Sequence, residues 1–258
     1  MPNRTVIVSA AILLLCATLV AQGKHPVSGR QIAGVMGHQG AAWLERAERE
    51  KEEAPSKAIA ALNIKTGQTV ADIGAGSGYY SVRLAGAVGP TGRVFATDIQ
   101  PEMLAIIKKK LDALPIPQIQ LVLGTPTESK LPDASVDLAL MVDVYHELSE
   151  PQVFLRSLKR ALKPGGRLVL IEFRKEDRRV PIREEHKMTV SEARKELEAE
   201  GYQFREVIDV LPWQHILVFT PNRADGRPEG RAYGWTARPE GRAYGRASGA
   251  ESPRRPDL

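Results

Sequence analysis

The stretch TVADIGAGSGYYSVRLAGAVGPTGRVFATD, residues 69–98, decides the fold. Its first five residues are mostly apolar and β-prone, which predicts a buried strand. The glycine-rich turn DIGAGSG follows at residues 72–78, and residues 79–88 have the pattern of a helix. Glycines permit a tight turn and let the backbone approach a ligand closely, and the start of a helix offers unpaired N–H groups. The stretch therefore predicts a strand, a ligand-binding turn and a helix.

The same stretch ends in an acidic residue at the end of a second predicted strand, residues 93–98. Asp98 stands twenty residues beyond Gly78. A carboxylate in this place can accept hydrogen bonds from both hydroxyls of a ribose. The dinucleotide pattern GxGxxG fails here, because it would need a glycine at Tyr79. The turn and the acid together indicate a nucleoside with free 2′ and 3′ hydroxyls.

Strands and helices alternate along the rest of the central region. We expect helices over residues 101–114, 151–162 and 189–200, and strands over residues 119–123, 136–142, 167–171, 204–210 and 215–220. Alternation with crossover helices implies parallel strands. The last two strands are too close in sequence for a crossover, so they must be antiparallel. The expected fold class is α/β, a Rossmann-like doubly wound sheet of seven mostly parallel strands with an antiparallel C-terminal strand and helices on both faces.

These features resemble the class I S-adenosylmethionine-dependent methyltransferases. The pattern DxGxGxG at residues 72–78 is similar to motif I of that family, and Asp98 stands at its ribose-binding position. The segments LPDASVD at residues 131–137 and KPGG at residues 163–166 resemble the family's segments before the fourth and fifth strands. The resemblance covers residues 69–172. It implies methyl transfer as the activity, with S-adenosyl-L-methionine as co-substrate.

The resemblance also implies roles for particular residues. Asp72 should act near the methionine part of the cofactor, and Ile99 should lie beside the adenine. The family often has an acid after Gly124 to contact the adenine. This chain has Thr125 there, so a threonine hydroxyl or a backbone N–H would take its place. The expected cofactor-binding residues are Asp72, Gly74, Gly76, Gly78, Asp98, Ile99, Thr125 and Asp143.

The segment Asp143-Val144-Tyr145-His146-Glu147 follows the fourth predicted strand. It falls at the carboxyl edge of the sheet, where open α/β sheets bind their ligands. A histidine has an ordinary pKa of about 6.5, so one hypothesis makes His146 a general base for the methyl acceptor. The alternative is a turn packed under the next helix. His146 and Asp143 are the catalytic candidates, with Asp143 on the cofactor side.

The connection over residues 172–188 is too long for an ordinary loop and too polar for a core. Because it follows a strand end, it could cover the acceptor site with Glu172, Arg174, His186 and Lys187. The alternative is a solvated surface loop. A metal site of Asp143, Glu172 and either His146 or His186 is conceivable, but no metal-ligand spacing supports it, so the sequence assigns no metal.

The first residues look like a secretory signal. Arg4 precedes a mostly apolar stretch at residues 6–20, and small residues follow it. An uncleaved anchor and a true start at Met36 are the alternatives. The protein is expected to be exported or periplasmic if the segment is a signal, and cytoplasmic otherwise. Any membrane contact would be made by this segment alone.

Residues 41–62 have helical spacing divided by Pro55, which predicts two helices. The first, over residues 43–53, is dense in charge, as in a solvated helix or in a lid over a ligand. The chain thus divides into a signal or anchor (residues 1–23), an N-terminal helical extension (24–62), a methyltransferase domain (63–220) and a tail (221–258).

The net charge of +5 comes from the two ends of the chain. Residues 31–220 hold 25 basic and 26 acidic side chains, so the folded part is nearly neutral. The tail repeats RPEGRAYG and has little to bury, so we expect it to be disordered. We therefore expect a small-molecule acceptor and no nucleic-acid partner for the folded domain. The single cysteine, Cys16, offers the domain neither a disulfide nor a thiolate metal site.

Two other functions compete with methyl transfer. One is a non-catalytic exported nucleoside-binding protein of the same fold. The other is an NAD(P)-dependent oxidoreductase, which the missing GxGxxG pattern disfavours. The identity of the acceptor, the atom that is methylated and the oligomeric state leave no mark in the sequence.

Overall fold

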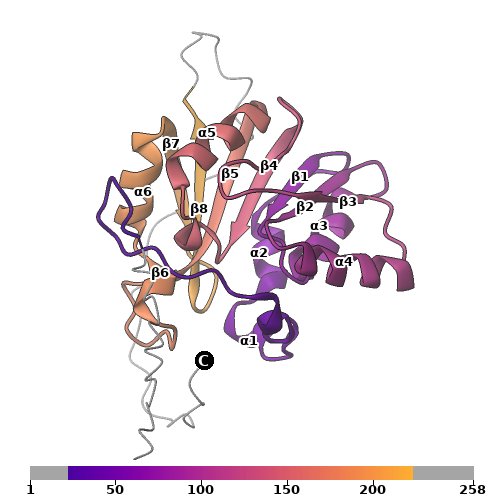
Figure 1. The fold of residues 1–258 in the computed structure, drawn as a ribbon, viewed down its shortest axis with the longest axis horizontal. Helices are drawn as coiled ribbons and strands as arrows, with labels where there is room; N and C mark the ends of the chain where they lie inside the picture. Colours follow the sequence, from indigo (N-terminus) through magenta and orange to yellow (C-terminus); the bar gives the residue numbers. More distant parts are fainter. Residues whose placement is uncertain (1–22, 223–258) are drawn as a thin grey trace, which may run out of the picture. The chain divides into compact units, whose positions relative to one another are not determined.

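One mixed sheet forms the centre of the structure, a computed structural model that describes residues 23–222 (Figure 1). The strand order is β3-β2-β1-β4-β5-β8-β7, and β8 runs in the direction opposite to the other six strands of this order. These strands are β1 (Thr69–Ile73), β2 (Arg93–Asp98), β3 (Ile119–Leu123), β4 (Val136–Val142), β5 (Leu162–Arg174), β7 (Tyr202–Ile208) and β8 (Gln214–Pro221). The expected doubly wound sheet with its antiparallel C-terminal strand is confirmed.

The expected number of seven strands was wrong by one short strand. β6 (Lys187–Met188) pairs in parallel with Phe173 and Arg174, which belong to the extended end of β5. Two residues carry no periodic pattern, so the sequence could not predict this strand. It forms because the long connection after β5 returns to the carboxyl end of that same strand.

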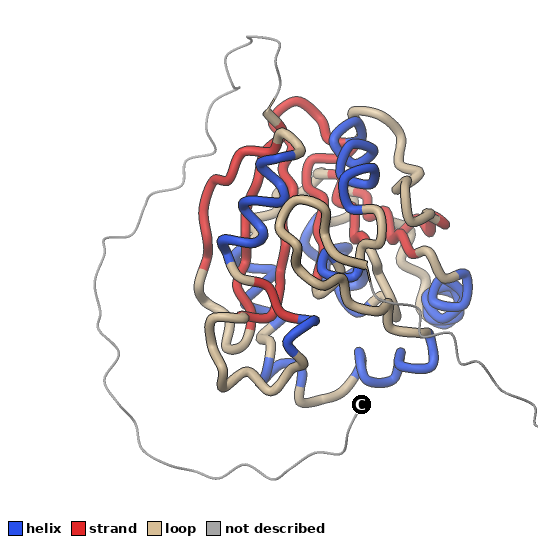
Figure 2. Tube along the Cα trace, turned by 60° about the vertical axis from the view of Figure 1, so that its left-hand side comes forward, coloured by secondary structure: helices blue, strands red, loops and turns tan. Residues whose placement is uncertain are grey.

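Helices cover both faces of the sheet (Figures 1 and 2). On one face, α5 and α6 bury Leu155, Leu158 and Leu197 against alternate residues of the strands. On the other face, α2, α3 and α4 bury Leu62, Leu84 and the other apolar side chains of a second core. The central strands are apolar on both sides because each face must contact a helical layer. The helices are α2 (Pro55–Ala61), α3 (Tyr79–Val88), α4 (Pro101–Ala113), α5 (Pro151–Ala161) and α6 (Val190–Ala199).

The order of the strands reverses between β1 and β4, because β2 and β4 pair with opposite edges of β1. At such a switch point the two neighbouring loops diverge and leave a crevice at the carboxyl ends of the strands. The glycine turn after β1 and the residues after β4 both lie there. This topology positions the site.

The N-terminal region departs from the expected pair of helices. The helix predicted over residues 43–53 is instead a 3-10 helix, η1 (His38–Glu45), a turn, and a single turn of α-helix, α1 (Arg49–Glu52). Pro55 does begin a new helix, α2, after Ala54 in a left-handed conformation with φ 50°. The charged side chains of this stretch turn inward: Arg49 and Glu53 are buried and paired with each other at 2.6 Å.

Residues 23–37 precede η1 without a helix; residues 26–28 form a turn, which brings Lys24 and Gln31 together in one isolated antiparallel bridge. This segment lies beside α6 and crosses the carboxyl edge of the sheet (Figure 1). Its Ala33 N–H donates to the carbonyl of His146 at 3.0 Å. The proposed signal and the tail lie outside the described residues, of which no helix is long and apolar enough to cross a membrane.

Candidate cofactor and active site

The turn after β1 needs its glycines. Gly74, Gly76 and Gly78 have φ values of 68°, 54° and 80°, the left-handed region that favours glycine. A β-carbon on Gly74 would lie 2.6 Å from a methyl of Val144, and one on Gly76 would lie 2.7 Å from a methyl of Leu44. The glycines therefore allow both the turn itself and the close approach of the segments beside it.

Asp98 connects the end of β2 to this turn. Its carboxylate accepts hydrogen bonds from the backbone N–H of Gly76 and of Gln100, both at 2.9 Å. The side chain is mostly buried, and this burial raises the pKa of Asp98 above its ordinary value. The geometry places an ionisable acceptor at the rim of the glycine turn, as the sequence predicted.

Asp72 lies beneath the turn, at the end of β1. Its carboxylate accepts a hydrogen bond from the Ser81 hydroxyl at 2.6 Å. Complete burial raises the pKa of Asp72 to about 6, and the hydrogen bond from Ser81 opposes this only in part. Asp72 thus stabilises the junction between β1 and α3.

Asp143 begins the loop after β4 in a left-handed conformation, with φ 54°. One carboxylate oxygen accepts from Gln214 Nε2 at 2.7 Å, while the other is buried without a hydrogen-bond partner. The hydroxyl of Tyr80 and the amide oxygen of Gln214 are likewise buried and unpartnered. Burial and the neighbouring Glu53 raise the pKa of Asp143 well above its ordinary value. Buried polar atoms without partners are rare, and they mark places where a ligand can bind.

A small pocket opens beside the glycine turn. Arg49 is its cation: the guanidinium donates to Glu53 at 2.6 Å and to the carbonyl of Leu44 at 2.9 Å, and it lies 4.4 Å from the ring centre of Tyr79. The sequence left the charged segment that contains Arg49 open as a solvated helix or as a lid over a ligand, and it singled out no residue within it. The residues that line the pocket are Leu44, Arg49, Gly74, Ala75, Ser77, Tyr79, Tyr80 and Val142.

The N-terminal region covers this pocket. Glu45 accepts hydrogen bonds from the Ser77 hydroxyl and from Lys110, both at 2.5 Å. These contacts join η1 to the glycine turn and to α4. Of the two interpretations of the charged segment, its position over the pocket favours the lid.

On the adenine side, the two predicted residues differ in accessibility. Ile99 is 40% exposed, so its side chain is free to contact a ligand. The Thr125 hydroxyl accepts from the backbone N–H of Glu128 at 3.0 Å, and the Thr125 N–H donates to the Glu128 carbonyl at 2.8 Å. Since its backbone N–H is engaged in this turn, only the hydroxyl hydrogen of Thr125 is available to an adenine.

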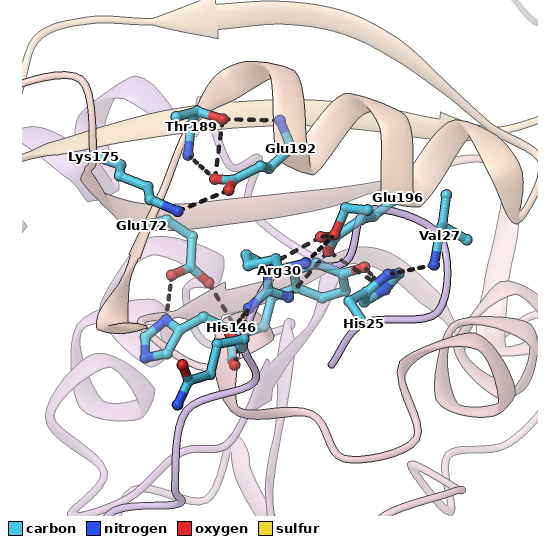
Figure 3. Close-up of polar contacts among 12 residues, drawn as sticks. His25, Val27, Arg30, His146, Glu172, Lys175, Thr189, Glu192 and Glu196 are labelled. Carbon is cyan, nitrogen blue, oxygen red and sulfur yellow. Dashed lines mark hydrogen bonds and ion pairs between the residues drawn. The ribbon is translucent and has the colours of Figure 1, made fainter. Parts of the chain in front are cut away.

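His146 forms a buried dyad with Glu172 (Figure 3). Its Nδ1 lies 2.6 Å from a carboxylate oxygen of Glu172, and its Nε2 lies 3.1 Å from Nδ1 of His186. A carboxylate only accepts hydrogen bonds, so Nδ1 carries the hydrogen and Nε2 keeps its lone pair. The second oxygen of Glu172 accepts from the Tyr145 N–H at 3.0 Å. His146 is thus both packed in a turn and held in one tautomer.

Residues 172–174 belong to the extended end of β5, so the connection begins later than the sequence predicted. Two of the four candidate residues reach this dyad. Glu172 and His186 contact His146, whereas Lys187 pairs with Glu184 at 2.9 Å and Arg174 donates to the carbonyl of Leu211 at 2.8 Å. The interaction between His146 and His186 joins residues that are 40 positions apart in sequence. No local spacing could have revealed it.

A second buried network joins the N-terminal segment to α6, and the sequence did not predict it. Arg30 donates two hydrogen bonds to Glu196 of α6, both at 3.0 Å, and His25 lies 3.4 Å from the same carboxylate (Figure 3). Arg30 also donates to the carbonyl of His146 at 3.2 Å. The network fastens the N-terminal segment to α6 and supports the turn that contains His146.

The geometry defines an α/β domain with a nucleoside-binding turn at its switch point, and comparison with known proteins agrees. Residues 71–170 match the family described as Methyltransferase domain. A solved S-adenosylmethionine-dependent methyltransferase from Aquifex aeolicus is similar with a TM-score of 0.68 and 30% identity, over 72% of this chain and 98% of that one. The chain belongs to the S-adenosylmethionine-dependent methyltransferases.

Curated relatives resemble part of the chain. A demethylmenaquinone methyltransferase of Oceanobacillus iheyensis is 33% identical over 111 residues, which are 43% of this chain and 47% of the relative. The corresponding enzyme of Bacillus mycoides is 30% identical over the same length. The chain thus matches about half the length of these relatives.

Proposed function

We propose that this protein transfers a methyl group from S-adenosylmethionine to a small-molecule acceptor. The observation that carries the proposal is the juxtaposition of the glycine turn and Asp98, joined by the hydrogen bond from Gly76 N–H to the Asp98 carboxylate at 2.9 Å. The family membership supports the same activity.

The described residues fit both ends of this co-substrate. At the nucleoside end, Asp98 would accept from the ribose hydroxyls and Ile99 would contact the adenine. Toward the methionine end, the unpartnered oxygen of Asp143 suits an ammonium group, and the Arg49 guanidinium suits a carboxylate. The buried polar atoms that lack partners in the chain would gain them from the ligand.

Bound S-adenosylmethionine supplies an activated methyl group, so the protein needs neither a covalent nucleophile nor a redox centre. Its main task is to hold donor and acceptor close and aligned, and such positioning is worth roughly 7–11 kcal/mol. The loops after β1 and β4 provide rigid walls for this purpose, because their backbone is fixed by the sheet.

We propose His146 as the residue that removes a proton from the acceptor. Its lone pair on Nε2 and the Glu172 carboxylate on Nδ1 are the arrangement of an oriented base. Asp143 would act on the cofactor side of the same edge. A variant Glu172→Gln should lower kcat and change its pH dependence, while the affinity for S-adenosylhomocysteine stays within about twofold.

The proposed class of acceptor rests on the net charge of the folded part and on the names of the similar enzymes. The folded part is nearly neutral, with 25 basic and 26 acidic side chains over residues 31–220, and this balance supports a small molecule rather than a nucleic acid. The relatives named above act on demethylmenaquinone, so an aromatic quinol is the first acceptor to test. Transfer of a labelled methyl group to a panel of phenols, quinols and amines would identify the acceptor.

Binding of S-adenosylhomocysteine, measured by calorimetry, tests the site directly. Asp98→Ala should weaken binding at least tenfold, whereas Asp112→Ala, an exposed acid on α4, should not change it. Equal affinities in the two variants would contradict the assignment of Asp98. Tight binding of NADH without binding of S-adenosylhomocysteine would favour an oxidoreductase instead.

We also propose export, because the sequence of residues 1–23 has the features of a secretory signal. The N-terminal residue of the protein isolated from cells tests this proposal. A new terminus near residue 22 supports a cleaved signal. A terminus at Met1 indicates an uncleaved anchor, and a terminus at Met36 contradicts export.

A further inference from the structure

We propose that His146, Glu147 and His186 form a binding site for a first-row transition-metal dication such as Zn²⁺. The three side chains present one ligand atom each within a radius that a single ion spans. They come from the turn after β4 and from η3 (Glu184–His186), which the long connection after β5 brings to the same edge of the sheet.

The distances among the ligand atoms suit one ion. His146 Nε2 lies 3.1 Å from His186 Nδ1, and Glu147 Oε1 lies 4.0 Å from each of these nitrogens. Zn²⁺ binds imidazole nitrogen and carboxylate oxygen at about 2.0–2.2 Å. Two ligands at such bond lengths and near-tetrahedral or right angles are about 3.0–3.5 Å apart. The nitrogens already have this separation, and a small rotation of the Glu147 side chain brings its oxygen into range.

The surroundings of the cluster are those of a built metal site. Glu172 fixes the ring of His146 through Nδ1 at 2.6 Å (Figure 3). The other nitrogen, Nε2, therefore faces His186, whose Nδ1 lies 3.1 Å away. A carboxylate on the second nitrogen of a ligating histidine is the usual partner in zinc proteins, because it sets the tautomer and increases the basicity of the ligand. The backbone N–H of Met36 donates to Glu147 Oε1 at 3.3 Å and holds the third ligand.

The donor set selects the metal. Two imidazoles and one carboxylate suit Zn²⁺, Fe²⁺, Co²⁺ or Ni²⁺, whereas Mg²⁺ and Ca²⁺ prefer oxygen ligands alone. Three protein ligands leave at least one coordination position open, as in catalytic rather than structural sites. The side chain of Val144, two residues before His146, packs on Gly74 of the cofactor turn. A bound metal would occupy the Nε2 lone pair of His146, so in that state the metal and not His146 would activate the acceptor. Given the proposed methyl transfer, the open position would bind the acceptor's oxygen or nitrogen atom near the donor and lower the pKa of its proton.

A hydrogen bond between the two imidazoles is the competing explanation of the 3.1 Å contact. It requires a hydrogen on His186 Nδ1 and gives no role to Glu147. The metal site instead requires all three side chains, and it predicts that the loss of Glu147 and the loss of His186 have the same consequence. This difference makes the two explanations distinguishable.

The experiment uses the full chain, freed of metal with a chelator, and titrates it with Zn²⁺ by calorimetry and with Co²⁺ by absorption spectroscopy. We expect one ion per chain and the visible spectrum of a Co²⁺ site with nitrogen ligands. His186→Ala and Glu147→Gln should each weaken Zn²⁺ binding at least 100-fold. Glu172→Gln, which removes only the supporting carboxylate, should weaken it by about 10–100-fold. His38→Ala removes a histidine outside the cluster and should leave binding unchanged.

The absence of saturable Zn²⁺ binding, or equal affinity in His186→Ala, Glu147→Gln and the unmodified chain, would overturn the proposal. S-adenosylhomocysteine affinity, measured on the same samples, shows that each variant is folded, since neither side chain belongs to the proposed cofactor site. If metal binding fails while this affinity is normal, the metal site alone is wrong. If the nucleoside does not bind either, the proposed function fails independently.

Discussion

The side chain of Leu44 lies over Gly76, so close that a β-carbon on the glycine would be 2.7 Å from Leu44 Cδ1. η1 of the N-terminal region therefore packs on the bare backbone of the cofactor turn. Gly76 meets two requirements: it adopts the left-handed conformation, with φ 54°, and it leaves room for Leu44 of the N-terminal region.

Gly76→Ala should lower the free energy of unfolding through both effects. The left-handed conformation costs an alanine about 1–2 kcal/mol, and the contact with Leu44 adds a steric cost. The double variant Leu44→Ala/Gly76→Ala should recover the steric part only, so the two substitutions should be non-additive in urea unfolding. Strict additivity would show that Leu44 does not pack on the turn.

We expect the Arg49 guanidinium to bind the carboxylate at the methionine end of the co-substrate. Arg49→Met should weaken the binding of S-adenosylhomocysteine by about tenfold or more, because a charge-assisted hydrogen bond is worth about 1.5–3 kcal/mol. Adenosine lacks the amino-acid part, so its affinity should stay the same and show that the turn is intact. A parallel loss of both affinities in calorimetry would mean that Arg49 acts on the fold rather than on the ligand.

The ion pair between Arg30 and Glu196 should stabilise the domain strongly. Both side chains are buried, and Arg30→Ala would leave the Glu196 carboxylate without its cation, at a cost of about 3–5 kcal/mol in urea unfolding. Arg194→Ala on the same helix breaks an exposed pair with Glu198 and should change stability by less than about 0.5 kcal/mol. Similar effects of the two substitutions would contradict the role of the buried pair.

Asp72 should make the domain less stable as the pH rises. Its pKa in the folded protein is about 6, above the ordinary 3.8, so between these values the native state binds more protons than the unfolded state. The contribution of Asp72 to the free energy of unfolding falls by about 3 kcal/mol in all as the pH rises from about 4 to 6. It stays constant at higher pH.

Asp72→Asn removes this titration, so stability curves across the pH range provide the check. The variant should gain stability relative to the unmodified protein between pH 4 and 7, since an amide can still accept the hydrogen bond from Ser81. A difference that does not depend on pH would contradict the raised pKa.

The local pattern of the sequence was sufficient for most of the fold. β1 and β2 have the predicted bounds, because a glycine turn and an acid delimit apolar runs of strand length. The antiparallel direction of β8 follows from its short link to β7. β6 escaped prediction, since its two residues become a strand only by pairing with the end of β5.

The charged residues near the N-terminus show where the pattern fails. Arg49 and Glu53 have the spacing of a solvated helix, yet they are buried beside the cofactor turn, because mutual pairing offsets the cost of removing them from water. Arg30 and Glu196, 166 residues apart, are a second case. Sequence spacing cannot show which charges will find a buried partner.

By itself, then, the sequence determined the layered α/β fold, the cofactor turn and the acid beside it, because these features depend on the conformation of neighbouring residues. Only the tertiary structure decided that Glu172 and His186 meet His146, that the N-terminal region covers the turn, and that Arg49 lines the pocket. Those relationships join segments far apart along the chain, and they form because buried polar groups must find partners when the helices close on the sheet.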